Sequence, residues 1–162
     1  MPIDVPPDTP LKVLGGETRP LEEWTTTFHL ALVVLDPYTY ESAWLLDTAG
    51  RILQHFAEAD CRTAFLLTCG DEEAATFLGP WAHELLTFVD PDRLAVKNLG
   101  LERLPALVHI NQANQIEAKA EGWEPDEWRA VAENLADRMS WRRPVIPETG
   151  DPSPYVGTPA LG

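Results

Sequence analysis

Long apolar runs and basic segments are largely missing from this chain. A membrane-spanning helix needs about 20 consecutive apolar residues, and no run in the sequence approaches that length. Residues 1–10 are acidic and interrupted by proline, so they lack both the basic start and the apolar centre of a signal peptide. We therefore expect no membrane insertion and a cytoplasmic location.

Positive charge is scarce as well. The chain has 12 lysines and arginines against 26 aspartates and glutamates, which gives a net charge of −14 at pH 7. Proteins bind nucleic acids and anionic lipids by neutralising phosphates with lysine and arginine. The charge balance therefore excludes nucleic acid as the expected partner, and it is compatible with a basic partner protein.

Cysteine occurs only twice, at Cys61 and Cys69. The residues between them read as one strand, which separates the two Cα atoms by roughly 26 Å at about 3.3 Å per residue. A disulfide requires a Cα separation of about 4.4–6.8 Å. The two cysteines therefore cannot pair with each other, which fits a reducing compartment.

The usual motifs of cofactor sites and activated nucleophiles are missing too. The sequence has no metal-ligand spacing, no Gly-rich phosphate loop and no G-x-S-x-G element. His29 and His109 lie in apolar, strand-like segments, and we interpret them as core or sheet-face residues. His55 and His83 lie in helical segments with no ligand partner at a recognised spacing. We expect no metal and no other cofactor.

The chain is long enough for one globular domain. Its 162 residues are 44% apolar, which excludes a disordered protein. We divide it into an extended N-terminal arm (1–10), a domain (11–141) and a Pro-rich C-terminal tail (142–162).

Strand and helix patterns alternate along the domain, which predicts an α/β fold with helices on both faces of a sheet. A hairpin is expected at 11–21 around Gly15-Gly16. Strands are predicted at 28–35, 63–68, 85–89, 106–110 and 115–120. Helices are predicted at 39–58, from a cap at Asp71 to an interruption at Gly79-Pro80, at 93–99, and from Pro125 onward.

Pro105 directly precedes the apolar strand 106–110. Proline donates no backbone hydrogen bond, so within a sheet it is confined to edges, bulges or a strand's first residue. An X–Pro bond is the only peptide bond that adopts the cis form at little cost. The Leu104–Pro105 bond is therefore a candidate cis bond.

This order of elements resembles the redoxins of the thioredoxin superfamily, especially the TlpA-like and peroxiredoxin branches. The similar segments are the hairpin from Leu11, the strand–helix–strand unit 63–89, and the path through 88–95 and Leu99-Gly100 to Pro105. The resemblance implies a three-layer α/β/α sandwich with an N-terminal β-hairpin and, in this chain, a C-terminal Pro-rich tail.

In that family the reactive thiols lie after the first buried strand, at the start of the long helix. Here this place reads Asp36-Pro-Tyr-Thr-Tyr-Glu-Ser-Ala-Trp44, with the hydroxyls of Thr39 and Ser42 where sulfur would stand. A hydroxyl forms no disulfide and is a weak nucleophile unless a base activates it. Glu41 is the only ionisable neighbour. The resemblance therefore implies the fold without the dithiol chemistry.

Two interpretations remain open for this segment. Thr39, Glu41 and Ser42 are either catalytic or, more simply, the cap of the long helix. The neighbouring aromatic residues Tyr38, Tyr40 and Trp44 either form a recognition surface or pack the helix onto the sheet.

Our first hypothesis is a redox-inactive binding, chaperone or assembly module that contacts another protein, for example as a subunit of a larger complex. It has no catalytic residue, and its binding residues would be Tyr38, Thr39, Tyr40, Glu41, Ser42, Trp44, Leu104 and Pro105. The alternative is an enzyme, a thiol–disulfide oxidoreductase or peroxidase that uses Cys69, since this residue ends a strand just before a predicted helix N-terminus. Cys61 is expected to be inert.

Overall fold

Eight strands form one mixed sheet in the computed structural model, which describes residues 2–162. Their spatial order is β1 (Ile3–Asp4), β9 (Gln115–Glu121), β8 (Ala106–Ile110), β4 (His29–Leu35), β5 (Cys61–Leu67), β6 (Leu86–Val89), β2 (Pro10–Val13) and β3 (Thr18–Pro20). Strands β4, β5 and β6 run parallel to one another, and the other neighbours pair antiparallel. The predicted strand 28–35 thus corresponds to β4, a central strand that is parallel to β5 on one side and antiparallel to β8 on the other.

Strand β4 is buried on both faces. Its residues from Leu30 to Leu35 are at most 2% exposed. Ala31, Val33 and Leu35 face one apolar cluster, while Leu30, Leu32 and Val34 face the other. This alternation is what a continuous apolar strand requires when helices cover both sides of the sheet.

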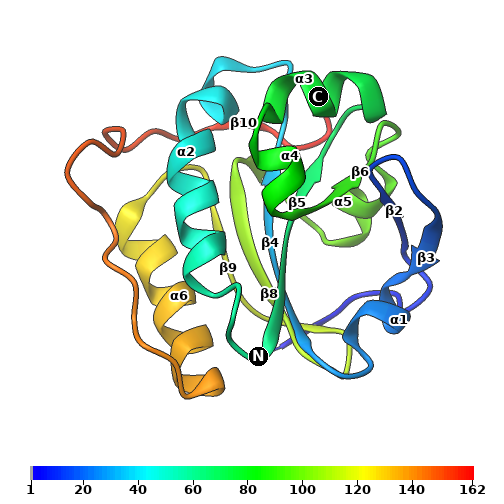
Figure 1. Cartoon of the computed structure of the whole chain (residues 1–162), viewed down its shortest axis with the longest axis horizontal. Helices are drawn as coiled ribbons and strands as arrows, with labels where there is room; N and C mark the ends of the chain where they lie inside the picture. Colours follow the sequence, from blue (N-terminus) through cyan, green and yellow to red (C-terminus); the bar gives the residue numbers. More distant parts are fainter. Residues whose placement is uncertain (1) are drawn as a thin grey trace.

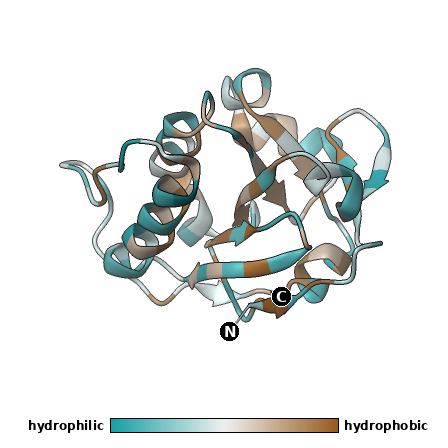
Figure 2. Cartoon of the chain, turned by 90° about the horizontal axis from the view of Figure 1, so that it is seen from below, coloured by the Kyte–Doolittle hydropathy of each residue, from teal (hydrophilic) through white to brown (hydrophobic). Residues whose placement is uncertain are grey.

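Helices cover both faces, so the domain has three layers (Figure 1). One face carries α2 (Tyr40–His55), α3 (Asp71–Leu78), α4 (Trp81–Glu84) and α6 (Pro125–Met139). The other face carries the short helices α1 (Leu21–Thr25) and α5 (Leu94–Asn98). Figure 2 shows the corresponding hydropathy: brown predominates in several central strands, whereas the helices carry both teal and brown. Among residues 2–162, no helix combines the length and apolar character that crossing a membrane demands.

Most of the predicted elements are present with shifted ends, and the Leu104–Pro105 bond is cis as predicted. The prediction that Asp71 caps this helix is wrong, because Gly70 is the N-cap of α3 and Asp71 is the first residue of the helix. The Asp71 carboxylate instead pairs with Lys12 at 3.0 Å and accepts from the Gly15 backbone N–H at 3.2 Å. The N-terminal arm also contributes β1, which pairs with β9 at the edge of the sheet.

Gly50 lies inside α2 for a packing reason. A Cβ atom at this position would lie 2.5 Å from the ring of Trp81. The indole therefore packs directly against the helix backbone, and its Nε1 donates to the Asp47 carboxylate at 3.1 Å. Glycine, which is unfavourable within a helix, is here the residue that lets α4 pack closely against α2.

The C-terminal tail is packed along the domain. In Figure 1 it runs, orange to red, from the end of α6 past the start of α2. Arg51 on α2 binds the tail through the Asp151 carboxylate at 2.7 Å and the Val145 carbonyl at 2.8 Å. Further along, Trp123 and Tyr155 exchange backbone hydrogen bonds of 2.9 and 3.0 Å. The tail ends as β10 (Thr158–Pro159), which pairs antiparallel with β7 (Arg103–Leu104).

Gly122 should be essential for docking the tail. Its φ is +74°, and a Cβ atom there would collide with the carbonyl of Val156. We expect Gly122→Ala to detach the tail, so that the amides of Tyr155 and Ala160 lose protection in hydrogen exchange.

Gly100→Ala is the matched control, because Gly100 has a similar φ of +68° and a Cβ atom there would meet no atom within 4 Å beyond its chain neighbours. Both variants carry the backbone cost of about 1–2 kcal/mol, so their difference isolates the contact with the tail. Equal protection of the two tail amides in both variants would contradict the prediction.

Candidate functional site

The turn between β4 and α2 is closed by its own polar groups. Thr39 caps α2 by accepting from the Ser42 backbone N–H at 3.4 Å, and its hydroxyl donates to the Asp36 carbonyl at 2.9 Å. The Ser42 hydroxyl is fully buried and accepts from the Asp36 backbone N–H at 2.9 Å. Both hydroxyls thus have structural partners, as the capping interpretation predicts.

A buried ion pair holds this turn against the tail. The Asp36 carboxylate accepts from the Tyr38 backbone N–H at 3.0 Å and from Arg93 Nη2 at 2.9 Å. The same guanidinium donates through Nη1 to the Ala160 carbonyl at 2.8 Å. Arg93 therefore compensates a carboxylate that is 3% exposed and at the same time holds the end of the tail. Sequence reasoning missed this link, because Asp36 and Arg93 lie in separate loops with no motif.

Three aromatic side chains stand exposed beside this turn, namely Tyr38 (64% exposed), Tyr40 (78%) and Trp44 (59%). We call them the aromatic strip. The Tyr38 hydroxyl donates to the Glu73 carboxylate, and this bond raises the pKa of Tyr38 to about 12. Trp44 contacts Tyr155 of the tail edge-to-face, with ring centroids 5.7 Å apart. These side chains do not pack the helix onto the sheet, and large exposed aromatics are the residue types that dominate protein interfaces.

The cis-proline segment lies beneath the tail. Leu104 and Pro105 are buried, and Leu104 pairs with Thr158 of β10. Both residues were expected among the surface contacts, but both are buried, and Leu104 is covered by the chain's own C-terminal segment. Glu41 is half-buried, and its backbone carbonyl accepts a hydrogen bond from the Tyr155 hydroxyl. Of the eight predicted binding residues, the aromatic strip is the part that is freely exposed.

Cys69 lies at the carboxyl ends of the parallel strands, as this turn does. It follows β5, which pairs with β4 so that Leu35 lies opposite Leu67. Because β5 and β8 flank β4 on opposite sides, the thiol and the cis-proline strand are separated by β4. Cys69 is 1% exposed; burial, followed by the charges of Glu73, Asp36 and Asp71, raises its pKa to about 12.

Cys61 lies at the other end of β5. It too is buried, and its thiol donates to the Phe56 carbonyl at 3.7 Å. Burial, with a smaller contribution from the Asp60 charge, raises its pKa to about 11. Both cysteines are free, and both are protonated at neutral pH.

The comparison with known proteins rests on solved structures, since no family model and no curated protein matches the chain. A putative thiol:disulfide interchange protein DsbE from Chlorobium tepidum aligns with a TM-score of 0.70 and 14% identity, over 86% of this chain and 98% of that one. Peroxiredoxin Q from Xanthomonas campestris gives 0.66 and 12%, over 85% and 96%. A hypothetical protein from Sinorhizobium meliloti 1021 gives 0.71 and 11%, over 99% and 94%.

These alignments cover most of this chain and of each similar structure, with TM-scores of 0.66–0.71. The chain has a thioredoxin-like fold, as the resemblance in the sequence implied. Identities of 11–14% establish the fold alone. Two of the three proteins are named for thiol or peroxide chemistry, whereas the turn between β4 and α2 of this chain carries hydroxyls and no cysteine.

The native protein should resist alkylation at both cysteines. A pKa of about 12, against an ordinary 9.0, leaves roughly a thousandfold less thiolate at Cys69 near neutral pH. We expect iodoacetamide at pH 8 to label Cys61 and Cys69 at least a hundredfold more slowly in the native protein than in urea, as followed by mass spectrometry.

The variants Cys61→Ser and Cys69→Ser assign each labelling rate to one residue. The labelling rate of either thiol should still rise as pH increases, because alkylation consumes the thiolate. Labelling of Cys69 in the native protein as fast as in urea would contradict its burial.

Proposed function

We propose that the protein is a redox-inactive binding module that contacts another protein through the aromatic strip. The observation that carries this proposal is the exposure of Tyr38, Tyr40 and Trp44 beside a turn whose hydroxyls are already bonded. Tyrosine and tryptophan offer large, rigid contact areas with a polar tip, so their exposure favours recognition over catalysis.

The surroundings of the strip favour a particular kind of partner. An open groove beside Tyr38 is lined by Pro37, Tyr38, Glu72, Glu73, Thr76 and Phe77. It combines apolar side chains with two carboxylates, and the whole chain carries a net charge of −14. A partner that presents apolar and basic side chains together would complement this surface. We further propose that the module acts in the cytoplasm, where free thiols persist.

The second candidate is a thiol oxidoreductase or peroxidase that uses Cys69. It is favoured by the names of the similar structures and by the location of Cys69 at the same edge of the sheet as Asp36. This activity requires the thiol to become exposed and to lose its proton, because a buried thiol with a pKa of about 12 supplies almost no thiolate. Peroxide or disulfide turnover that is lost in Cys69→Ser would favour this candidate over the binding module.

Truncating Tyr40 and Trp44 of the strip should weaken partner binding without unfolding the protein. A tyrosine or tryptophan that is a hot spot costs about 2 kcal/mol or more when truncated at an interface. We expect Tyr40→Ala/Trp44→Ala to weaken binding of the partner by at least about thirtyfold, which corresponds to one such residue. The measurement is quantitative pull-down from the native cell, followed by titration of the isolated partner.

Ile3→Ala is the control, because Ile3 is an exposed apolar residue (49%) on β1, at an edge of the sheet. It should leave partner binding unchanged. Equal binding by the double variant and the wild type would sink the proposed role of the strip.

A further inference from the structure

A second cluster of polar side chains lies at the first residue of β4, at the opposite end from Asp36. His29, His109 and Glu117 each place a potential ligand atom within 4.8 Å of the others. His29 Nδ1 and His109 Nε2 are 2.8 Å apart. His109 is fully buried, while His29 and Glu117 are half-buried. The cluster is independent of the aromatic strip and of the function proposed for it.

The sheet register brings these side chains together. His109 of β8 pairs with Ala31 of β4, so His29, two residues before Ala31, points to the same face. On the other side His109 pairs with Ala118 of β9, whereas Ile110 pairs with Ile116. Glu117 is thus the extra residue of a β-bulge. Bulges re-aim side chains, and this one turns a carboxylate toward the two imidazoles.

The second partners of these groups are suited to ligation. Asn134 on α6 lies 3.3 Å from His109 Nδ1. The Asn134 atom at this distance is the amide nitrogen Nδ2, which donates to Nδ1 and leaves the His109 proton on Nε2, between the two rings. Turning the amide over places its oxygen there instead, so that Asn134 accepts from Nδ1–H and the Nε2 lone pair is free for a metal ion.

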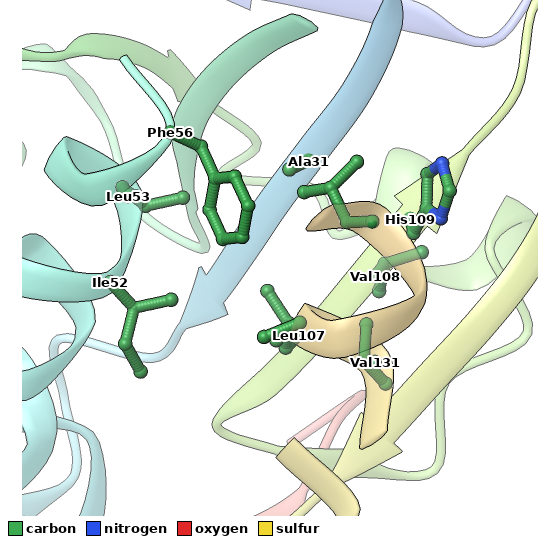
Figure 3. A pocket seen from close by; sticks show the side chains of 10 residues that line it. Ala31, Ile52, Leu53, Phe56, Leu107, Val108, His109 and Val131 are labelled. Atoms are coloured by element: carbon green, nitrogen blue, oxygen red, sulfur yellow. The ribbon is translucent and has the colours of Figure 1, made fainter. Parts of the chain in front are cut away.

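Solvent reaches the cluster from one side. An open polar pocket beside it is lined by His29, Asp60, Gln112 and Arg138, among other residues. The opposite side is apolar: Figure 3 shows His109 at the margin of a cavity formed by α2, α6 and the sheet, with Phe56, Leu107 and Val131 among its lining residues. A ligand can therefore enter at His29 and would meet a closed apolar wall behind His109.

The geometry points to a binding site for one divalent transition-metal ion, held by His29 Nδ1, His109 Nε2 and a Glu117 oxygen. Two imidazoles and one carboxylate form a donor set that suits zinc, nickel, iron or copper. Water from the polar pocket would complete the coordination. Two nitrogen ligands of a tetrahedral zinc ion are about 3.3 Å apart. His29 Nδ1 and His109 Nε2 are 2.8 Å apart, so the two rings would have to separate slightly for an ion to replace the hydrogen bond between them.

Arg138 is the built-in competitor. Its Nε donates to Glu117 Oε1 at 2.8 Å, and its Nη2 donates to the other carboxylate oxygen. A metal ion must share or displace this guanidinium, whose own charge also opposes a cation. The affinity for metal should therefore rise when Arg138 is replaced by an uncharged residue. If His29 and His109 only stabilised the fold, no such rise would be expected.

The sequence could not reveal this site. His29 and His109 are 80 residues apart, and Glu117 follows on a third strand. Their meeting depends on the strand order β9-β8-β4 and on the bulge, neither of which a residue spacing records.

The test is titration of the full-length protein, produced without a histidine tag and stripped with EDTA, with ZnCl₂ by calorimetry and with CoCl₂ by visible absorption. We expect one equivalent of each ion to bind, tetrahedral Co²⁺ bands to appear, and the thermal midpoint to rise with Zn²⁺ concentration. His29→Ala and Glu117→Gln should each weaken binding at least tenfold. Arg138→Met should strengthen it severalfold.

His83→Ala is the matched control, since His83 is a histidine on α4 away from the cluster. Circular dichroism checks that each variant is folded. The absence of stoichiometric binding in the wild type would overturn the proposal. It would also be overturned by full binding in both His29→Ala and Glu117→Gln, or by weaker binding in Arg138→Met.

Discussion

Strand β4 can carry polar side chains only at its ends, because helices cover both of its faces and its residues from Leu30 to Leu35 are almost fully buried. Its surroundings become polar at two places. These are His29, the first residue of the strand, and Asp36, the residue that follows it. The rest of the structure is arranged around these two ends. At one end the carboxylate meets Arg93 and the tail, and at the other the imidazole meets His109.

The end at Asp36 shows how a buried charge organises its neighbours. Removing a carboxylate from water is costly unless it is paired and hydrogen-bonded. Asp36 is held by a backbone N–H and by Arg93 Nη2, and Arg93 Nη1 donates to the Ala160 carbonyl. The tail is therefore coupled to the start of α2 through one guanidinium. The polar groups of this turn serve its own structure, which leaves the exposed aromatic residues as the groups free to meet a partner.

The sequence was a good guide to elements and a poor guide to contacts. The apolar run 106–110 and the preceding Pro105 predicted both β8 and its cis bond, because those signals are local. Capping by Thr39 could be predicted for the same reason. The covering of Leu104 by β10 could not, because it depends on a tail that folds back over 54 residues of sequence. The cluster around His109 was hidden likewise, since its residues meet through strand order and a bulge.

The docked tail also bears on how a partner can bind. A peptide that paired with β7 would have to displace β10, which is tethered to the same domain and competes at a high effective concentration, on the order of millimolar for short linkers. A partner that contacts Tyr40 and Trp44 meets no such competition, because these side chains are already exposed. Trp44 nevertheless touches Tyr155, so a bound partner would rest on the tail as well as on α2. In the complex that we propose, the tail is part of the recognition surface, because Tyr155 packs against Trp44 of the aromatic strip.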